Sequence, residues 1–318
     1  MGPGEQTLYS RIRALLSGIA QLRHIGNLQA VLGRLETAHE QILINQGIAF
    51  ATQNSHKQIN FLHDTEFKVF SSRGEDGIIQ FLTANLDIQN RTFIEFGIED
   101  FRESNCRFLM MKDNWRGFVI DASARHIEAL KASNYYWKFD LNAQQAFITC
   151  DNIAALLELS GFEKDLGLLS IDIDGMDYWI AQKLIHWKPR ILIVEYNAVF
   201  GATRAITVPY SADFNRTAAH PSNLYFGASL KALCKLTTSW GYSLVGTNSG
   251  GTNAFFVRND LLNETVRARR FDEAFTLSKS RESRDIDGRL TFISGEERLR
   301  TIAGLRVLNV DTNEIETL

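Results

Sequence analysis

The stretch LLSIDIDGMDYWIAQKLIHWKPRILIVEYN, residues 168–197, decides the fold. Its first apolar run ends in acidic residues and a turn at Gly175. An amphipathic segment follows over roughly Asp177–His186, and a second apolar run, ILIVEY, completes the stretch. A strand, a helix and a strand in this order form a βαβ unit. Such units are right-handed, so the stretch predicts an α/β fold with a parallel sheet covered by helices.

Polar side chains gather where both of these predicted strands end. Asp172, Asp174 and Asp177 follow the first strand. Glu195 and Asn197 end the second. Ligands of open α/β sheets bind beyond the carboxyl ends of the strands. One acid is enough to cap the intervening helix, so the other polar groups predict a site on this rim. Asp174 and Glu195 are its candidate catalytic acids.

Composition excludes several classes of protein. The chain has 318 residues, of which 45% are hydrophobic and 22% charged, as in ordinary globular proteins. Its net charge of −3 does not attract nucleic acid, so we expect no nucleic-acid partner. Three cysteines without C-x-x-C spacing indicate neither a zinc site nor a disulfide framework. There is no signal peptide and no apolar run of membrane-spanning length, which predicts a cytoplasmic protein without an integral membrane segment. A peripheral membrane association stays open.

Residues 1–56 are predicted to form an N-terminal helical arm. No proline occurs from Leu8 to Gln53, and apolar residues recur near helical spacing in two runs, before and after Gly26-Asn27. These runs predict amphipathic helices. They could form a homo-oligomer, dock on a partner or a membrane surface, or pack against the main domain. The narrow apolar stripe lacks clear heptads, which favours packing or a dimer.

The main domain, predicted over residues 57–262, begins with glycines and acids at a helix start. In SSRGEDGIIQFLTANL, residues 71–86, Gly74 and Gly77 flank Glu75 and Asp76. Glycines at this position let the backbone approach a ligand. A plain helix cap is the alternative interpretation.

A stronger pattern follows in RTFIEFGIEDFRESNCRFLMMKDNWRGFVIDAS, residues 91–123. FIEFG is a predicted strand ending at Gly97, a helix is predicted over Ser104–Lys112, and GFVID is a strand ending in Asp121. A glycine turn with an acid about 20 residues later suits a cofactor whose ribose hydroxyls bind the acid. The full G-x-G-x-x-G pattern is absent, which argues against a pyrophosphate site and fits a nucleoside ligand without phosphates.

The remaining elements extend the same sheet. A third strand is predicted over Ala146–Cys150, and Asp151-Asn152 at its end could contact a base. A helix is predicted over Asn223–Trp240, and YSLVGTNSGGTNAFFVRND then predicts an antiparallel hairpin. Residues 263–318 are predicted to form a C-terminal extension with a helix or two and a final strand.

These residues carry a resemblance. Glu95–Gly97, Asp121, Gly74–Asp76 and SIDIDG…IVEYN resemble the class I S-adenosylmethionine-dependent methyltransferases, and more closely their FkbM-type branch. That branch has an acid-rich D-x-[DE]-G after the fourth strand and a Glu ending the fifth. The resemblance covers roughly Glu66–Asp260, and the second glycine of the usual first motif is missing. It implies a Rossmann-like methyltransferase fold, with a mostly parallel seven-stranded sheet and a C-terminal antiparallel hairpin.

The resemblance also implies residue roles. Glu95 and Gly97 would lie near the methionine part of S-adenosylmethionine, Asp121 would hold its ribose, and Asp151 or Asn152 would border its adenine. The full set of predicted cofactor-binding residues is Gly74, Glu75, Asp76, Glu95, Gly97, Asp121, Asp151, Asn152 and Asp172.

A long connection, GATRAITVPYSADFNRTAAHPS over residues 201–222, predicts the acceptor site. Long ordered loops are often functional. Arg204 and Arg216 could pair with a phosphate or carboxylate, and Tyr210 could stack on a sugar ring. His220 is a candidate catalytic base. The alternative is a lid with ordinary surface charges.

The resemblance implies an S-adenosylmethionine-dependent methyltransferase, and by the same analogy the methyl group would move to a hydroxyl of a small-molecule or glycan acceptor, as in polysaccharide biosynthesis. The acceptor must be aligned and its proton removed, by a base or by a metal ion. Asp174, Glu195 and Asn197 could hold a Mg²⁺, and a metal-free hydrogen-bonding role stays equally open. Two alternatives remain: a metal-dependent sugar- or nucleotide-processing transferase on the same fold, and a non-catalytic methyltransferase-like assembly protein.

Overall fold

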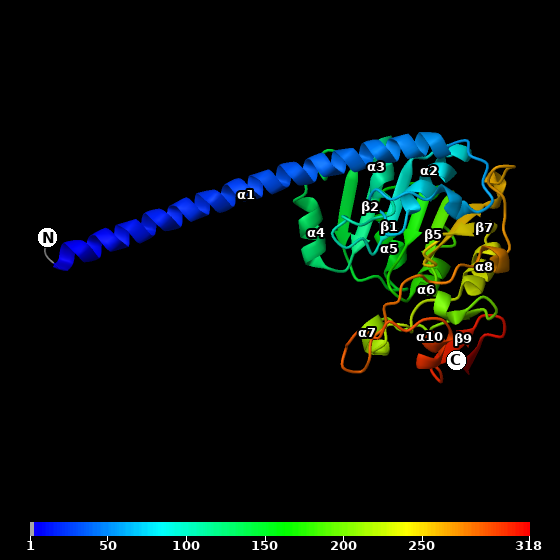
Figure 1. Ribbon diagram of the computed structural model, residues 1–318. Helices are drawn as coiled ribbons and strands as arrows, with labels where there is room; N and C mark the ends of the chain where they lie inside the picture. The colour runs from blue at the N-terminus through cyan, green and yellow to red at the C-terminus, as the bar shows by residue number, and fades with distance from the viewer. Residues whose placement is uncertain (1–2) are drawn as a thin grey trace. The chain divides into compact units, whose positions relative to one another are not determined.

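A seven-stranded sheet with the strand order β3-β2-β1-β4-β5-β8-β7 forms the centre of the protein (Figure 1). The computed structural model describes residues 3–318, with the side chains of residue 28 and residues 30–318. The strands are β1 (Thr92–Phe96), β2 (Arg116–Asp121), β3 (Leu141–Gln145), β4 (Leu168–Ile171), β5 (Ile191–Glu195), β7 (Tyr242–Thr247) and β8 (Asn253–Arg258). Strands β1 to β5 pair in parallel, whereas β8 is antiparallel to both β5 and β7. The predicted fold class, including the closing antiparallel hairpin, is confirmed.

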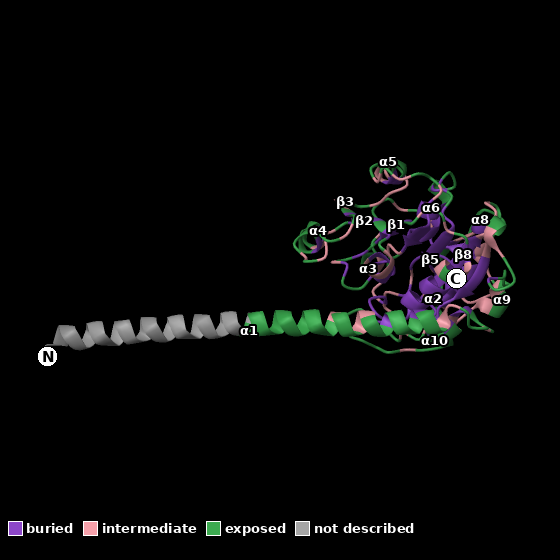
Figure 2. Ribbon diagram, turned by 90° about the horizontal axis from the view of Figure 1, so that it is seen from above, coloured by how far each residue is buried: buried purple, intermediate pink, exposed green. Residues whose placement is uncertain are grey.

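Helices cover both faces of this sheet. One face packs against α5 (Ile153–Glu158), α6 (Asp177–Lys183) and α8 (Leu230–Thr238). The other packs against α2 (Glu75–Asn85), α3 (Arg107–Asp113) and α4 (Ala124–Lys131). Neighbouring residues of one strand serve opposite faces, because side chains alternate along a strand. The strands are therefore buried on both sides, as Figure 2 shows for β5 and β8.

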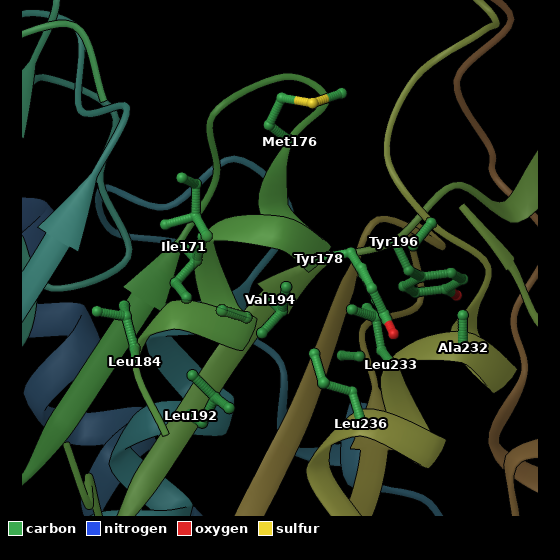
Figure 3. Close-up of a cluster of buried hydrophobic side chains, with 14 of the residues drawn as sticks. Ile171, Met176, Tyr178, Leu184, Leu192, Val194, Tyr196, Ala232, Leu233 and Leu236 are labelled. Carbon is green, nitrogen blue, oxygen red and sulfur yellow. The ribbon is translucent and has the colours of Figure 1, made fainter. Parts of the chain in front are cut away.

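The first of these cores lies directly below the polar rim. Ile171 of β4 and Val194 of β5 pack with Leu233 and Leu236 of α8 (Figure 3). Each is buried, and burying a side chain of this kind contributes roughly 1.5–3 kcal/mol. This packing fixes where β4 and β5 end, and so fixes the positions of the acids that follow them.

The C-terminal residues belong to the same compact unit as the sheet, which spans residues 49–318. A second sheet joins β6 (Ile206–Thr207), inside the long connection, to β9 (Arg306–Asn309) and β10 (Glu314–Thr317). The short helices are α7 (Arg216–Ala219), α9 (Phe271–Ala274), α10 (Glu296–Thr301), η1 (Leu62–Thr65), η2 (Ala198–Phe200) and η3 (Asn259–Leu261). The predicted boundaries at residues 56 and 262 stay predictions.

Two predicted elements differ from the structure. The third strand is Leu141–Gln145 rather than Ala146–Cys150, which is loop. An edge strand has one neighbour and can be half-exposed, so the polar sequence LNAQQ forms β3 and carries no apolar signal. The helix predicted over Asn223–Trp240 begins only at Leu230, where the Ser229 hydroxyl accepts a hydrogen bond from the Ala232 N–H.

The N-terminal segment is one helix, α1 (Pro3–Asn54), rather than two. Gly26 does not interrupt it, because a glycine inside a helix costs only about 1 kcal/mol relative to alanine and no proline follows Pro3 in the helix. Residues 1–48 form a compact unit of their own. Leu28, Leu32 and Leu35 are each more than half exposed there, at 51%, 55% and 60%. The predicted apolar run before Gly26 lies outside the described side chains.

Within the described residues, no helix has both the length and the apolar character needed to cross a membrane.

Deleting residues 1–48 should leave residues 49–318 folded and change the oligomeric state, because exposed leucines on a helix are buried when copies associate. Light scattering gives the mass, and thermal unfolding gives the integrity of the truncated chain. An unchanged number of subunits would contradict the oligomerisation hypothesis, and an insoluble product would show that the arm belongs to the core.

Candidate functional site

A cavity of about 410 Å³ lies at the carboxyl edge of the parallel strands. Its wall includes the ends of four strands: Glu95 from β1, Asp121 from β2, Asp172 after β4 and Glu195 from β5. Asn253, the first residue of the antiparallel strand β8, lies opposite Glu195 in register. The structure thus brings five polar side chains from different parts of the sequence to one place.

Gly97 allows two walls of this cavity to meet. Its φ is +68°, and a Cβ atom there would lie 1.7 Å from the Asp172 carbonyl oxygen. Its N–H donates a hydrogen bond of 3.0 Å to the Ile120 carbonyl. The turn after β1 therefore lies against the loop after β4, which only glycine permits.

Glu95 is buried and well supplied with hydrogen-bond donors. Its carboxylate accepts hydrogen bonds from the Ser104 hydroxyl at 2.6 Å and from the N–H groups of Asn105 at 2.7 Å and Cys106 at 3.2 Å. Burial nevertheless raises the pKa of Glu95 to about 7. Ser104 and Asn105 also line the cavity. From the sequence, these two residues were expected only to lie at the start of a predicted helix.

Asp121, which lines the cavity, keeps a free acceptor position. Its carboxylate accepts hydrogen bonds from the N–H groups of Glu99 and Ser123, both at 2.8 Å, and lies 3.3 Å from a ring nitrogen of His126. A carboxylate has about four acceptor positions, so at least one is left for a ligand hydroxyl.

Asp172, Asp177 and Glu195 form an acid cluster, with carboxylate oxygens all within 4.8 Å of one another. Asp177 accepts hydrogen bonds from the N–H groups of Ile173 at 2.9 Å and Gly175 at 3.0 Å, which fixes the loop after β4. Burial is the main cause that raises the pKa of Asp172 and of Glu195 well above their usual values, and repulsion within the cluster adds to it.

Asp172, Glu195 and Asn253 lack donors for their side-chain oxygens. Among the described residues, none donates a hydrogen bond to the carboxylate of Asp172 or Glu195, and Glu195 Oε2 is buried. Asn253 Nδ2 donates to Glu75 Oε1 at 2.9 Å, while its buried Oδ1 has no partner. Buried acceptors without donors favour a ligand that carries positive charge or many donors, or a metal ion.

Glu75 and Asp76 shape the site without lining the cavity. Asp76 Oδ2 accepts hydrogen bonds of 2.8 Å from the N–H groups of Val69, Phe70 and Ser71 and from the Ser71 hydroxyl. Glu75 Oε1 accepts from Asn253 at 2.9 Å and from Asn248 Nδ2 at 2.6 Å. Both acids are buried, and neither they nor Gly74 contribute to the cavity wall, so cofactor contact at these three residues stays a prediction.

The predicted metal ligands Asp174, Glu195 and Asn197 do not come together. Asn197 donates to the carbonyls of Leu224 and Phe226, both at 2.9 Å, and its Oδ1 accepts from the Val199 N–H, so its side chain serves the fold. Asp174 lines the cavity, but it pairs with Arg216 at 2.9 Å and its side chain is 70% exposed. The acids that do cluster are those at positions 172, 177 and 195.

The other predicted residues lie outside the cavity wall. Asn152 folds its own loop, accepting from the Thr149 N–H and donating to the Phe147 carbonyl, both at 2.8 Å, and Asp151 is exposed beside it. The Tyr210 hydroxyl accepts from the Cys150 N–H at 3.0 Å. Phe147, which the sequence did not single out, reaches the cavity instead.

Two further predicted residues contact parts of the long connection and the C-terminus. Arg204 pairs with Glu316 of β10 at 2.7 Å. His220 Nδ1 lies 2.7 Å from the Ser222 hydroxyl, and burial lowers the pKa of His220, which favours the neutral ring. His220 does not line the cavity, so its role as a base stays a prediction.

No protein-family model matches the sequence, and no curated protein matches it. Among solved structures, the chain is similar to a candidate O-methyltransferase from Klebsiella pneumoniae, at 10% identity and a TM-score of 0.38, over 68% of this chain and 90% of that one. It is also similar to human N-acetylserotonin methyltransferase in complex with SAM, at 13% identity and a TM-score of 0.33, over 58% of this chain and 56% of that enzyme. Coclaurine N-methyltransferase gives 13% identity and a TM-score of 0.34, over 66% and 67%.

Replacing Asp76 by Asn should strongly destabilise the protein. The amide puts an N–H₂ group or a neutral oxygen where three buried N–H groups now bind a carboxylate, and each buried group left unsatisfied costs about 1–3 kcal/mol. Urea unfolding measures the loss, with Asp64→Asn on η1 as a control that also accepts backbone N–H groups but at an exposed site. Equal stability of Asp76→Asn and the parent would contradict a positioning role.

Stability should decrease as the pH rises from about 4 to about 7. Burial raises the pKa of Glu95 from 4.5 to about 7 and that of Asp76 from 3.8 to about 6, so the folded chain binds more protons than the unfolded chain in this window. For Glu95 alone the loss is on the order of 3 kcal/mol at most. Urea unfolding at several pH values should show a smaller decrease for Glu95→Gln than for the exposed control Glu158→Gln. Identical dependence of stability on pH in the two variants would contradict the contribution of Glu95.

Proposed function

We propose that this protein is an S-adenosylmethionine-dependent methyltransferase that methylates a hydroxyl of a small-molecule or glycan acceptor. The observation that carries the proposal is the set of unpaired oxygens of Asp172, Glu195 and Asn253 in a cavity at the carboxyl edge of the sheet. The sulfonium and ammonium groups of S-adenosylmethionine carry positive charge that such oxygens stabilise. The same acids would repel a pyrophosphate, which disfavours dinucleotide cofactors.

Residue roles follow from positions around the cavity. Asp121, at the end of β2, would accept hydrogen bonds from ribose hydroxyls, and Glu95 and Gly97 would lie beside the amino acid part of the cofactor. Bound S-adenosylmethionine would supply the methyl group. Glu195 and Asp172, which line the cavity, would accept the proton of the acceptor hydroxyl as that oxygen is methylated. Its raised pKa makes the Glu195 carboxylate a stronger base than an ordinary carboxylate.

The proposal extends to the finer features expected from the sequence. It includes membership of the FkbM-type branch, a role in polysaccharide biosynthesis, a cytoplasmic location and association of copies through α1. The acid motif after β4 and the glutamate that ends β5 support the first of these. Arg216, paired with Asp174 at the cavity wall, supports acceptor binding on that side.

A metal-dependent transferase is the second candidate. Asp172, Asp177 and Glu195 offer carboxylate oxygens within 4.8 Å, and Asn253 adds an unpaired amide oxygen on the same wall. Oxygen ligands of this kind suit Mg²⁺. In a methyltransferase the ion would lower the pKa of the acceptor hydroxyl, and in the alternative it would bind substrate phosphates.

Calorimetry with S-adenosylhomocysteine tests the proposal. The parent should bind, and Asp121→Ala should bind roughly 10- to 100-fold more weakly, because a hydrogen bond to a charged group is worth about 1.5–3 kcal/mol. Asp140→Ala is the matched control, since this exposed acid pairs with Arg116, the first residue of β2. It should bind as the parent does.

The same titration separates the alternatives. Binding that persists in chelator supports a metal-free methyltransferase, and binding that returns only with Mg²⁺ supports a metal-assisted one. If the parent binds no S-adenosylhomocysteine with or without Mg²⁺, the methyltransferase proposal is wrong. Saturable binding of a nucleotide sugar with Mg²⁺ would then favour the second candidate.

A further inference from the structure

Three side chains that end in oxygen atoms follow one another across neighbouring strands at the cavity. Ile171 of β4 pairs in register with Val194 of β5, so the next residues, Asp172 and Glu195, lie side by side. Asn253 of β8 is the register partner of Glu195 on the other side. Residues paired across neighbouring strands point to the same face of a sheet. Asp172, Glu195 and Asn253, here called the oxygen row, all contribute to the cavity wall.

Asn253 presents its oxygen, and not its amide nitrogen, as the unpaired group. The residue is 3% exposed, and its Nδ2 donates to Glu75 Oε1 at 2.9 Å. Because a carboxylate accepts hydrogen bonds but does not donate them, Glu75 fixes the orientation of this amide. Oδ1, which has no partner among the described residues, is therefore an acceptor. Since an amide is not acidic, this missing donor is independent of the gathering of acids beside it.

The oxygen row lacks both donors and positive charge. Glu195 is 9% exposed and its Oε2 has no partner, and no described residue donates to the carboxylate of Asp172. Seven acidic side chains contribute to the cavity wall, whereas no lysine, arginine or histidine of the described chain does so. Buried acceptors without donors are unfavourable. The missing donors and charge must therefore come from a ligand.

A primary ammonium group matches the oxygen row in donors and in size. It carries one positive charge and three N–H groups, as many as the row has side chains. With N···O distances of about 2.9 Å at tetrahedral angles, two oxygens bound to one nitrogen lie about 4.7 Å apart. Carboxylate oxygens of Asp172 and Glu195 lie within 4.8 Å of each other. One ammonium can thus bind both carboxylates and direct its third N–H toward Asn253.

The cofactor proposed above does not supply these donors. Its sulfonium has no N–H group, and its ammonium would lie beside Glu95 and Gly97, at the end of β1. In the sheet, β4 separates β1 from β5, which puts the ends of β1 and β5 about 10 Å apart. The oxygen row, on β4, β5 and β8, is therefore left for the other substrate.

We propose that the oxygen row binds a protonated primary amine of the methyl acceptor, so that the acceptor is a hydroxyl compound with an amine, such as an amino alcohol or an amino sugar. The acidic wall repels phosphate and carboxylate groups. Each carboxylate has about four acceptor positions, so one that holds an N–H can still take the proton of the acceptor hydroxyl. The identity of the amine as a methyl acceptor rests on the proposed function, whereas the ammonium site itself does not.

Thermal unfolding of the full chain with ethanolamine tests the site. The solution is neutral, where ethanolamine is protonated, and contains chelator, with ionic strength held constant by NaCl. Ethanolamine should raise the Tm, because a ligand that binds the folded state stabilises it. Choline, which has the charge but no N–H group, and ethylene glycol, which has no charge, should not. An unchanged Tm with ethanolamine, or an equal increase with choline, would overturn the proposal.

Variants assign the effect to the oxygen row. Glu195→Gln should increase the ethanolamine concentration that gives half of the maximal Tm increase by about tenfold, because a hydrogen bond to a charged group is lost. Asp172→Asn serves the same purpose if Glu195→Gln does not fold. Glu103→Gln is the matched control, since Glu103 also lines the cavity but is 61% exposed and pairs with Lys68. A parent-like response of a folded Glu195 variant, or an equal loss in the Glu103 variant, would contradict the site.

Calorimetry with S-adenosylhomocysteine in saturating ethanolamine assigns the amine to the acceptor. The two ligands should bind together, with the same affinity for S-adenosylhomocysteine as without ethanolamine. Weaker binding in ethanolamine would place the row within the cofactor site and overturn the assignment. If S-adenosylhomocysteine does not bind at all, the methyltransferase proposal fails, while the ammonium site stays supported by its own titration.

Discussion

The burial of carboxylates at the converging ends of parallel strands is the constraint on which this structure depends. Parallel β1, β4 and β5 end at one edge, so Glu95, Asp172 and Glu195 are drawn into one cavity wall. Charged groups removed from water need donors or counter-charges. Glu95 obtains three donors from the segment before α3, whereas Asp172 and Glu195 obtain none from the described residues. That difference separates the part of the rim that is structurally complete from the part that requires a ligand.

The acids of this region divide into two groups by their hydrogen bonds. Asp76 and Asp177 accept several backbone N–H groups and so shape the loops around the cavity. Asp172 and Glu195 face the cavity with free oxygens. The hydrogen bonds of Asp76 and Asp177 keep the unpaired oxygens of Asp172 and Glu195 together, because a loop that moved would separate them.

Periodicity and strand-end chemistry predicted most of the sheet. The apolar runs before Gly97, Asp121, Asp172 and Glu195 became β1, β2, β4 and β5. The edge strand β3 was not predicted, because a strand with one neighbouring strand needs little apolar surface and its sequence, LNAQQ, is mostly polar. The single helix α1 was not predicted, because Gly26-Asn27 suggested a break, whereas a glycine costs too little to end a helix that has no proline after Pro3.

The sequence by itself determined that acids follow the central strands, because the order of apolar runs fixes which residues lie at the carboxyl edge. It did not determine which polar side chains at that edge keep oxygens without hydrogen-bond partners. Asn197 is occupied by the carbonyls of Leu224 and Phe226, while Asn253 is oriented by Glu75, 178 residues earlier in the chain. Only the tertiary structure decided these roles, because hydrogen-bond partners distant in sequence, and their absence, set the charge and availability of each side chain.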